Sequence, residues 1–281
     1  VASLFVTSSH DYVMFITNHG RLHWLKGYRI PEGSRQSKGK PIVNLLSDLE
    51  EGEKVVNTIC ASGFPEDRYL VFCTREGLIK KTSLAAYGNV RARGIKAIKL
   101  DDNDELIETD ITDGSEQIII ASADGQAVRF DESDARATGR DTMGVKGMTL
   151  NEGDRVVSMA VVKPGDRLLT VSENGYGKIS DVDDYRKTRR GGKGVITIKT
   201  DERNGRVVCV RKVCNGDQLM LTSASGKIIR IDTDEIRETG RNAKGVRIMD
   251  MRDGDKVVAV EPATSPVLSK GISGAHKIQG I

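Results

Sequence analysis

Apolar residues along the chain gather in short runs that end at a glycine turn, and this arrangement recurs five times. Val, Ile, Leu and Thr dominate the runs, and Gly, Asn and Asp separate them, which is typical of strands and their turns. The five segments are SLFVTSSHDYVMFITNHGRLHWL, YLVFCTREGLIKKT, IIIASADGQAVRF, LLTVSENGYGKIS and LMLTSASGKIIRI. Each predicts a β-hairpin whose glycine takes the positive φ that other residues resist.

Two series of glycines define the period of the repeat. The turn glycines are Gly20, Gly77, Gly125, Gly175 and Gly226, at spacings of 57, 48, 50 and 51 residues. The second series is Gly39, Gly94, Gly144, Gly194 and Gly245, at spacings of 55, 50, 50 and 51 residues. Because the two series move together, we place copies of one unit at residues 3–60, 68–112, 116–162, 166–213 and 217–263.

Each copy closes with an acidic turn and a further apolar run, such as EGEKVVNTI or EGDRVVSMAV, so that each copy holds about four short strands. Five such units predict an all-β, propeller-like array in which neighbouring sheets bury each other's faces. Residues 1–263 would form this domain, and residues 264–281 are a C-terminal tail that matches no copy. A single tryptophan, Trp24, disfavours the familiar propeller blades that carry a Trp-Asp signature.

The rest of the composition narrows the class of protein. No apolar run reaches the length of about 18 residues that a membrane-spanning helix needs, and the first residues lack a signal-peptide layout, which predicts a cytoplasmic location. The four cysteines form no C-x-x-C pair and are expected as free thiols. His19 and His23 lie four residues apart, but no further ligand completes a metal set, so we expect polar surface histidines.

The net charge of +3 conceals a strong internal polarity. The connector between the hairpin and the second glycine holds five Lys or Arg and one acid over residues 26–40, and six and none over residues 78–100. It holds seven Lys or Arg and three acids over residues 178–199, and six Lys or Arg and four acids over residues 227–247. Only residues 129–146 are balanced, with four basic and four acidic residues. Equivalent connectors of a radial array lie on the same side, so the sequence predicts a continuous basic arc that suits a curved polyanion.

The most basic connector contains the segment TRRGGKG, which is Thr188, Arg189, Arg190, Gly191, Gly192, Lys193 and Gly194. Glycines let the backbone approach phosphates closely, while the flanking cations contact them. A nucleotide-binding P-loop is excluded, because Lys187 stands where its first glycine is required and no hydroxyl follows the lysine. No Ser, His and Asp grouping stands out, and we predict no catalytic residue, metal or cofactor.

Three long segments resemble one known family, the C-terminal domain of the DNA gyrase A protein, a β-pinwheel. They are RIPEGSRQSKGKPIVNLL, NGYGKISDVDDYRKTRRGGKGVITIKTDERNG and GRNAKGVRI, and the likeness covers residues 1 to about 263. The resemblance implies about six four-stranded, strand-exchanged blades with a basic rim around which duplex DNA bends with a fixed hand. It also implies a nucleoid-associated bacterial enzyme whose remaining parts, the rest of the gyrase A protein and the gyrase B protein, use ATP to introduce negative supercoils.

The family's box reads Gln-Arg-Arg-Gly-Gly-Lys/Arg-Gly and lies in its first blade. Here Thr188 replaces the glutamine, and the match falls in the fourth copy. Compared with the family, the chain is expected to begin after the first-blade segment. The resemblance therefore makes TRRGGKG the equivalent connector of the family's fifth blade.

These observations predict a DNA-wrapping module that contacts phosphates rather than bases. The predicted DNA contacts are Arg35, Lys38, Lys40, Lys80, Lys81, Arg91, Arg93, Lys96, Arg140, Lys146, Lys178, Lys187, Arg189, Arg190, Lys193, Arg241 and Lys244. One alternative is the corresponding domain of topoisomerase IV. Another is a propeller-type scaffold whose basic loops bind an acidic protein. A hydrolase with a site in the central channel would need carboxylates or histidines that converge from several copies, and no such set recurs in the sequence.

Overall fold

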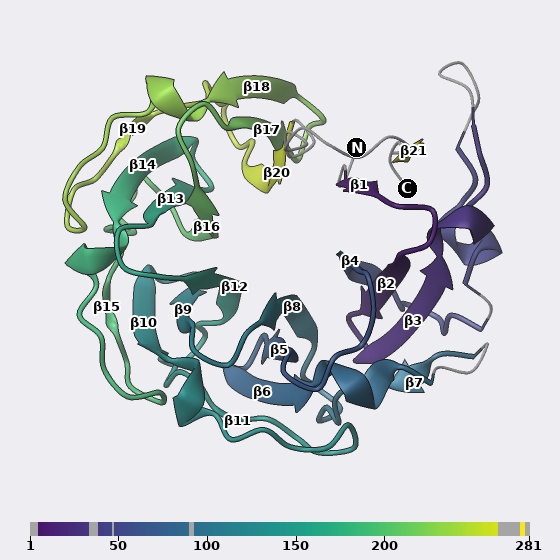
Figure 1. The fold of residues 1–281 in the computed structure, drawn as a ribbon. Helices are drawn as coiled ribbons and strands as arrows, with labels where there is room; N and C mark the ends of the chain where they lie inside the picture. The colour runs from purple at the N-terminus through teal and green to yellow at the C-terminus, as the bar shows by residue number, and fades with distance from the viewer. Residues whose placement is uncertain (1–4, 34–38, 47, 90–92, 264–275, 279–281) are drawn as a thin grey trace.

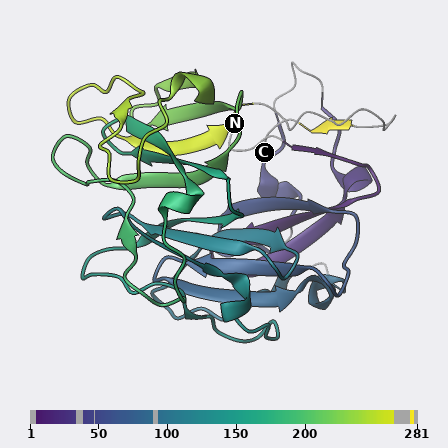
Figure 2. The same ribbon diagram turned by 60° about the vertical axis from the view of Figure 1, so that its left-hand side comes forward.

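The computed structural model describes residues 5–33, 39–46, 48–89, 93–263 and 276–278 of the chain. The strands form five sheets, or blades, arranged radially about a central axis (Figure 1). A short sheet of β1 (Phe5–Thr7) and β21 (His276–Ile278) lies between the last blade and the first (Figures 1 and 2). None of the described helices is long and apolar enough to cross a membrane.

The predicted hairpins form the middle of each blade. They are β2 (Tyr12–Thr17) with β3 (Arg21–Lys26), β5 (Tyr69–Thr74) with β6 (Leu78–Ser83), β9 (Gln117–Ser122) with β10 (Gln126–Asp131), β13 (Arg167–Ser172) with β14 (Tyr176–Asp181), and β17 (Gln218–Ser223) with β18 (Ile228–Asp232). All five turn glycines have φ between 75° and 87°, the left-handed region that glycine occupies without strain. We number the blades 1 to 5 after these hairpins.

The acidic turn of each copy leads into the strand nearest the axis. These inner strands are β4 (Val55–Ala61), β8 (Leu106–Thr112), β12 (Val156–Val162), β16 (Val207–Val213) and β20 (Val257–Pro262). Each pairs with the first hairpin strand of its own copy and carries a register shift near its start.

The outermost strand of a blade comes from the connector of the following copy. These two-residue strands are β7 (Ile95–Lys96) on blade 1, β11 (Val145–Lys146) on blade 2, β15 (Val195–Ile196) on blade 3 and β19 (Val246–Arg247) on blade 4. The resulting order, for example β12-β9-β10-β15, is the strand exchange that the resemblance implied. Blade 5 has the three-stranded order β18-β17-β20 in the described part of the chain.

A short 3₁₀ helix follows the second hairpin strand of every copy. These helices are η1 (Gly27–Arg29), η3 (Leu84–Tyr87), η4 (Glu132–Asp134), η5 (Val182–Asp184) and η6 (Thr233–Glu235). An additional one, η2 (Ile42–Asn44), lies in the first connector, where the other copies form their outer strand.

The hydrophobic core lies between neighbouring blades rather than inside one sheet. Ile118 and Ile120 of β9 belong to one core cluster with Val71 of blade 2, whereas Ile119 of the same strand belongs to another cluster with Leu168 of blade 4. Successive residues of a strand face opposite sides, so a strand covered on both sides is apolar throughout, as in IIIAS. The predicted all-β, propeller-like class is confirmed. The described residues form five blades rather than about six, because five copies supply five hairpins.

Candidate nucleic-acid interface

The connectors run along the outside of the ring, on the face farthest from the axis (Figure 1). Each one first lies parallel to the second hairpin strand of the preceding blade, through the bridges Lys81 to Ala137, Arg129 to Lys187 and Ile179 to Glu238. It then turns back and pairs with that same strand as the outer strand of the blade. The connectors of the third, fourth and fifth copies therefore reach the rim in the same way.

Hydrogen bonds join successive connectors into one belt. The amide of Lys99 donates to the carbonyl of Thr142 at 3.1 Å, which connects the second and third copies. The amide of Gly191 donates to Gly147 at 2.7 Å, and that of Thr149 to Gly192 at 2.9 Å, which connects the third and fourth. Backbone hydrogen bonds thus join the connectors of the second, third and fourth copies along the rim, and the side chain of Arg241 joins the fifth connector to the fourth. We call the connectors together the outer belt.

Most of the cations predicted to bind DNA are on this belt and reach solvent. The exposed ones are Lys40, Arg93, Lys96, Lys146, Lys187, Arg189, Lys193 and Lys244, and the half-buried ones are Arg140, Arg190 and Arg241. Arg35, Lys38 and Arg91 lie outside the described residues.

Carboxylates neutralise some of these cations. Lys187 Nζ lies 3.0 Å from Asp131 Oδ2, Lys244 Nζ lies 2.5 Å from Asp201 Oδ2, and the exposed Arg93 and Asp48 are 3.7 Å apart. Exposed pairs of this kind are weak in water, so they can exchange for contacts to phosphates. Among the predicted DNA contacts that lie in the described part of the chain, the exposed ones without an ion pair are Lys40, Lys96, Lys146, Arg189 and Lys193.

In the TRRGGKG loop, one cation is bonded to the protein and two others are exposed to solvent. Arg190 is an anchor, since its Nε donates to the carbonyl of Asp134 at 2.9 Å and its Nη1 to that of Lys146 at 3.0 Å. Gly191 takes φ 89°, and its amide is already bonded to Gly147, so this amide does not face a phosphate. Arg189 and Lys193, on either side of the bend, remain exposed.

Arg241 repeats the anchoring of Arg190 one copy later. Its Nε donates to the carbonyl of Asp184 at 3.1 Å, and its Nη1 donates to the carbonyl of Ile196. These carbonyls occupy the same places in their copy as those bound by Arg190. Arg190 and Arg241 therefore each fasten one copy to the preceding copy.

The structure corrects three of the predicted DNA contacts, because Lys80, Lys81 and Lys178 are buried. Lys80 Nζ donates to the carbonyls of Ala97 at 2.6 Å and Arg140 at 2.7 Å, and Lys178 Nζ donates to that of Gly240 at 3.1 Å. Lys81 Nζ reaches the carbonyl of Glu132 at 3.1 Å. All three lie on second hairpin strands, which the next copy covers, so they stabilise the ring and do not reach DNA.

Sequence reasoning missed three exposed arginines of the belt, Arg136, Arg186 and Arg237. They follow η4, η5 and η6 directly, and each stands eight residues before the second glycine of its copy. An alignment of the copies by that glycine would have shown them as one column. They add three equally placed cations to the belt.

Two groups of side chains have the composition of a metal site, but protein donors already satisfy their carboxylates. Glu53 accepts from Thr17 Oγ1 at 2.6 Å and from Arg21 Nη1 at 3.1 Å, beside His19 and Glu50. In the second group, Glu132 accepts from Thr112 Oγ1 at 2.7 Å, beside Asp113 and Glu116.

The expectation of a surface histidine was wrong for His23, which is buried against Gly94. Burial lowers the pKa of His23.

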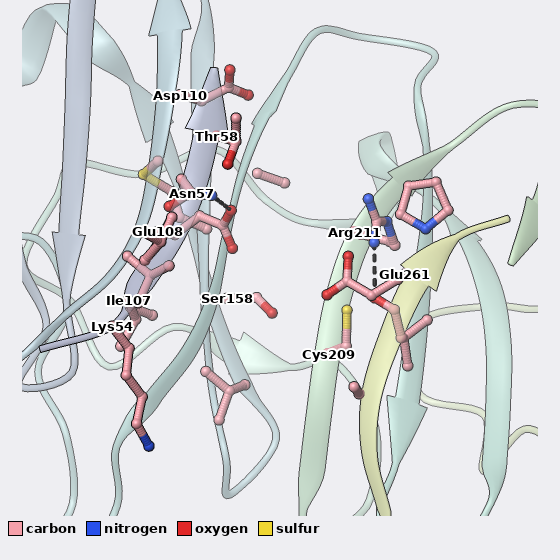
Figure 3. A pocket seen from close by; sticks show the side chains of 18 of the residues that line it. Lys54, Asn57, Thr58, Ile107, Glu108, Asp110, Ser158, Cys209, Arg211 and Glu261 are labelled. Carbon is pink, nitrogen blue, oxygen red and sulfur yellow. Dashed lines mark hydrogen bonds between the residues drawn. The ribbon is translucent and has the colours of Figure 1, made fainter. Parts of the chain in front are cut away.

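The inner strands surround an axial cavity of about 880 Å³ (Figure 3). Glu108 accepts a hydrogen bond from Asn57 Nδ2 at 2.9 Å, and burial raises the pKa of Glu108 to about 7. Burial also raises the pKa of the Cys209 thiol to about 11, which removes it as a nucleophile. The lining includes the carboxyls of Glu108, Asp110 and Glu261, and no histidine among the described residues.

Comparison with known proteins gives a consistent result. A family model described as the DNA gyrase C-terminal domain, beta-propeller, matches residues 11–62, 68–113, 116–163, 166–213 and 217–264. The DNA gyrase A protein of Clostridium acetobutylicum is 47% identical over 260 residues, which cover 92% of this chain and 31% of that protein. The corresponding protein of Neisseria gonorrhoeae is 36% identical over 324 residues, which cover 100% of this chain and 35% of that protein. The chain spans about a third of the length of these relatives.

Two solved structures have the same shape. A DNA gyrase A C-terminal domain has a TM-score of 0.76 at 30% identity, with 91% of this chain and 83% of that chain covered. A C-terminal domain of DNA topoisomerase IV has a TM-score of 0.83 at 25% identity, with 90% and 79% covered. The backbone agrees slightly better with the topoisomerase IV domain, and the sequence agrees better with the gyrase domain.

Proposed function

Because the chain belongs to the DNA gyrase C-terminal domain family, we propose that it is a non-catalytic module that wraps duplex DNA along its outer belt. The observation that carries the proposal is the set of exposed cations on the outer belt, which includes the evenly spaced column of Arg136, Arg186 and Arg237 as well as Lys146, Arg189 and Lys193. A scaffold for an acidic protein would not require equally spaced cations along an arc. DNA presents negative charge at regular intervals, so a DNA-binding arc does require equally spaced cations.

The physical task of wrapping explains why several blades carry cations. Bending 20 to 30 base pairs by 40 to 90° costs about 1 to 6 kcal/mol. One connector offers only a few contacts, so the bend is stable only when successive blades contribute. Contacts to phosphates carry no base information, and we expect preference for sequences that bend easily.

The proposal extends to the whole enzyme. The rest of the gyrase A protein and the gyrase B protein would cleave and rejoin DNA and hydrolyse ATP, while this chain supplies the wrapped segment for negative supercoiling. It would act beside chromosomal DNA in the bacterial cytoplasm.

The direct test is the salt dependence of binding to a long duplex. Each lost phosphate contact lowers the slope of log affinity against log salt by about 0.9, so the double variant Arg189→Ala, Lys193→Ala should lower it by about 1.8. The matched control is Lys54→Ala, Lys163→Ala, which removes the same charge from exposed sites off the belt and should leave the slope nearly unchanged. Equal slopes in the two double variants would contradict the assignment of the belt.

Wrapping itself is tested by resealing relaxed circular plasmid in the presence of the chain. A shift in linking number that grows with protein is expected, and binding that is independent of duplex length would instead favour the scaffold. The sign of the shift gives the hand of the wrap.

A further inference from the structure

Two buried lysines in the ring have no acidic partner. Lys80 of β6 and Lys178 of β14 are 2% and 0% exposed, and within the described residues neither forms an ion pair. Both stand three residues after the turn glycine of their hairpin. Burying an ammonium group costs free energy unless the group is paired, so the burial of these two lysines needs an explanation.

Both lysines bind the loop that the following copy lays over their blade. Lys80 Nζ donates to the carbonyls of Ala97 at 2.6 Å and Arg140 at 2.7 Å, and thereby joins two successive connectors. Lys178 Nζ donates to the carbonyls of Gly240 and Arg241. Arg140 and Arg241 are equivalent belt arginines, each four residues before the second glycine of its copy. The buried ammonium thus lies directly beneath the backbone of a belt arginine.

Blade 3 shows that the fold does not require a cation at this position. Its equivalent residue is Val128, which is 1% exposed. The loop lies as close there as in blade 4, since a Cβ on Gly194 would lie 3.0 Å from Val128 Cγ2 and a Cβ on the equivalent Gly245 would lie 3.4 Å from Lys178 Cβ. A valine therefore fits between hairpin and belt, and the lysines of blades 2 and 4 serve the loops above them.

We propose that Lys80 and Lys178 are positioning residues of the DNA surface, each holding one belt loop, residues 137–146 or 238–247, so that the exposed Lys146 or Lys244 of that loop faces the duplex. The inference rests on the proposed function of the belt. Neither lysine contacts DNA.

The protonation of these lysines provides a signature that a purely structural residue would lack. Burial lowers the pKa of both to about 8, and a nearby arginine, Arg140 or Arg241, contributes to the lowering, while Asp141 or Asp184 opposes the shift. The Tyr87 hydroxyl shares the carbonyl of Ala97 with Lys80, and the Phe72 ring lies 5.6 Å from its Nζ.

In an opened loop the lysine is solvated, with a pKa of about 10.4. The opened loop therefore binds more protons than the closed loop between pH 8 and 10, and closure strengthens by about tenfold from pH 7 to pH 9.

The first experiment measures amide hydrogen exchange of the 281-residue chain at pH 7, 8 and 9, with rates corrected for intrinsic exchange. Opening of loops 137–146 and 238–247 should fall by about tenfold across this range. Loop 186–194, which lies over Val128, is the internal control and should not change. The variants Lys80→Val and Lys178→Val reproduce the blade 3 residue and should each abolish the trend in its own loop only. An equal trend in all three loops, or a trend that survives in the variants, overturns the inference.

The second experiment measures duplex affinity of the same proteins over the same pH range. The wild type should bind several-fold tighter at pH 9 than at pH 7, and the double variant should bind more weakly and show no such rise. A wild-type protein that fails to bind duplex contradicts the proposed function. The hydrogen-exchange result then tests only whether the two lysines hold their loops. A wild type that binds, with variants that keep the same rise, overturns the positioning role and leaves the proposed function intact.

Discussion

Blades 4 and 5 are built from similar sequences, yet their second hairpin strands lie in different environments. In blade 4, β14 lies between β13 and the donated β19, and its four central residues are buried. In blade 5, β18 pairs only with β17 within the described residues, and Ile228 at its start is 58% exposed. The inner strands of the two blades, β16 and β20, pair in the same way.

The difference teaches that a blade is completed by the copy that follows it. Residues of one alignment column then have different roles, depending on whether a connector covers them. Arg129 in blade 3 and Arg230 in blade 5 illustrate this, because both side chains donate to the equivalent glutamine, Gln117 or Gln218. Arg129 is buried beneath the next copy, whereas Arg230 is exposed.

The largest expected effect comes from this pair of arginines. Arg129 Nη1 donates to the carbonyls of Val182 at 2.9 Å and Tyr185 at 3.1 Å. Arg129→Met therefore leaves the Tyr185 carbonyl unpaired, whereas the Val182 carbonyl keeps its bond from the Tyr185 amide. The unpaired carbonyl costs about 1 to 3 kcal/mol and the lost bond to Val182 about 1 kcal/mol more, so we expect a loss of about 2 to 4 kcal/mol in the free energy of unfolding. Arg230→Met is the matched control and should change it by less than about 0.5 kcal/mol. Urea unfolding compares the two, and equal losses would contradict completion by the next copy.

The turn glycines offer a second matched pair with a smaller effect. Gly175 and Gly226 have φ of 84° and 87°, so alanine costs about 1 to 2 kcal/mol at either position through the backbone alone. A Cβ on Gly175 would also overlap the carbonyl oxygen of Met249 in the next copy, whereas a Cβ on Gly226 would meet no described atom within 4 Å. Gly175→Ala should therefore be less stable than Gly226→Ala by about 1 to 3 kcal/mol, the usual cost of overpacking.

Thermal and urea unfolding of the two glycine variants give this difference directly. A Gly226→Ala variant as unstable as Gly175→Ala would indicate that blade 5 is covered in solution as blade 4 is.

The last prediction concerns the inner edge, where blade 2 and blade 5 each carry a carboxyl on the inner strand. Burial raises the pKa of Glu108 on β8 to about 7 and raises that of Glu261 on β20. The unfolded chain has a Glu pKa near about 4.3, so the folded state binds more protons above that pH, and stability falls as pH rises from about 4.3 to 7. Glu108→Gln removes this loss, and its stability relative to wild type should be greater at pH 7.5 than at pH 5.

Glu261→Gln should change stability in the same direction as Glu108→Gln, because both carboxyls line the axial cavity. Urea midpoints at the two pH values provide the measurement. An opposite sign for Glu261→Gln would show that blade 5 differs from the other blades at its inner edge as well.

Much of the fold follows from local sequence signals. The hairpins, the positive φ of the turn glycines and the period of the copies depend on residues close together in the chain, and all were predicted. The outer position of the connectors followed from the equal spacing of the copies. The candidate site was predicted less completely. A count of cations along a connector treats Lys80 and Lys146 alike, and it gives no weight to the column of Arg136, Arg186 and Arg237.

By itself, the sequence determined the repeated unit, its turns and its likeness to the gyrase family, because these depend on backbone preferences and on contacts within one copy. Only the tertiary structure decided which cations face water. That outcome depends on a two-residue strand and a loop that arrive from the next copy along the chain and cover the hairpin before them. Exposure of a charge is set by packing between copies, and residues with the same neighbours in sequence can therefore lie in water in one blade and beneath the belt in another.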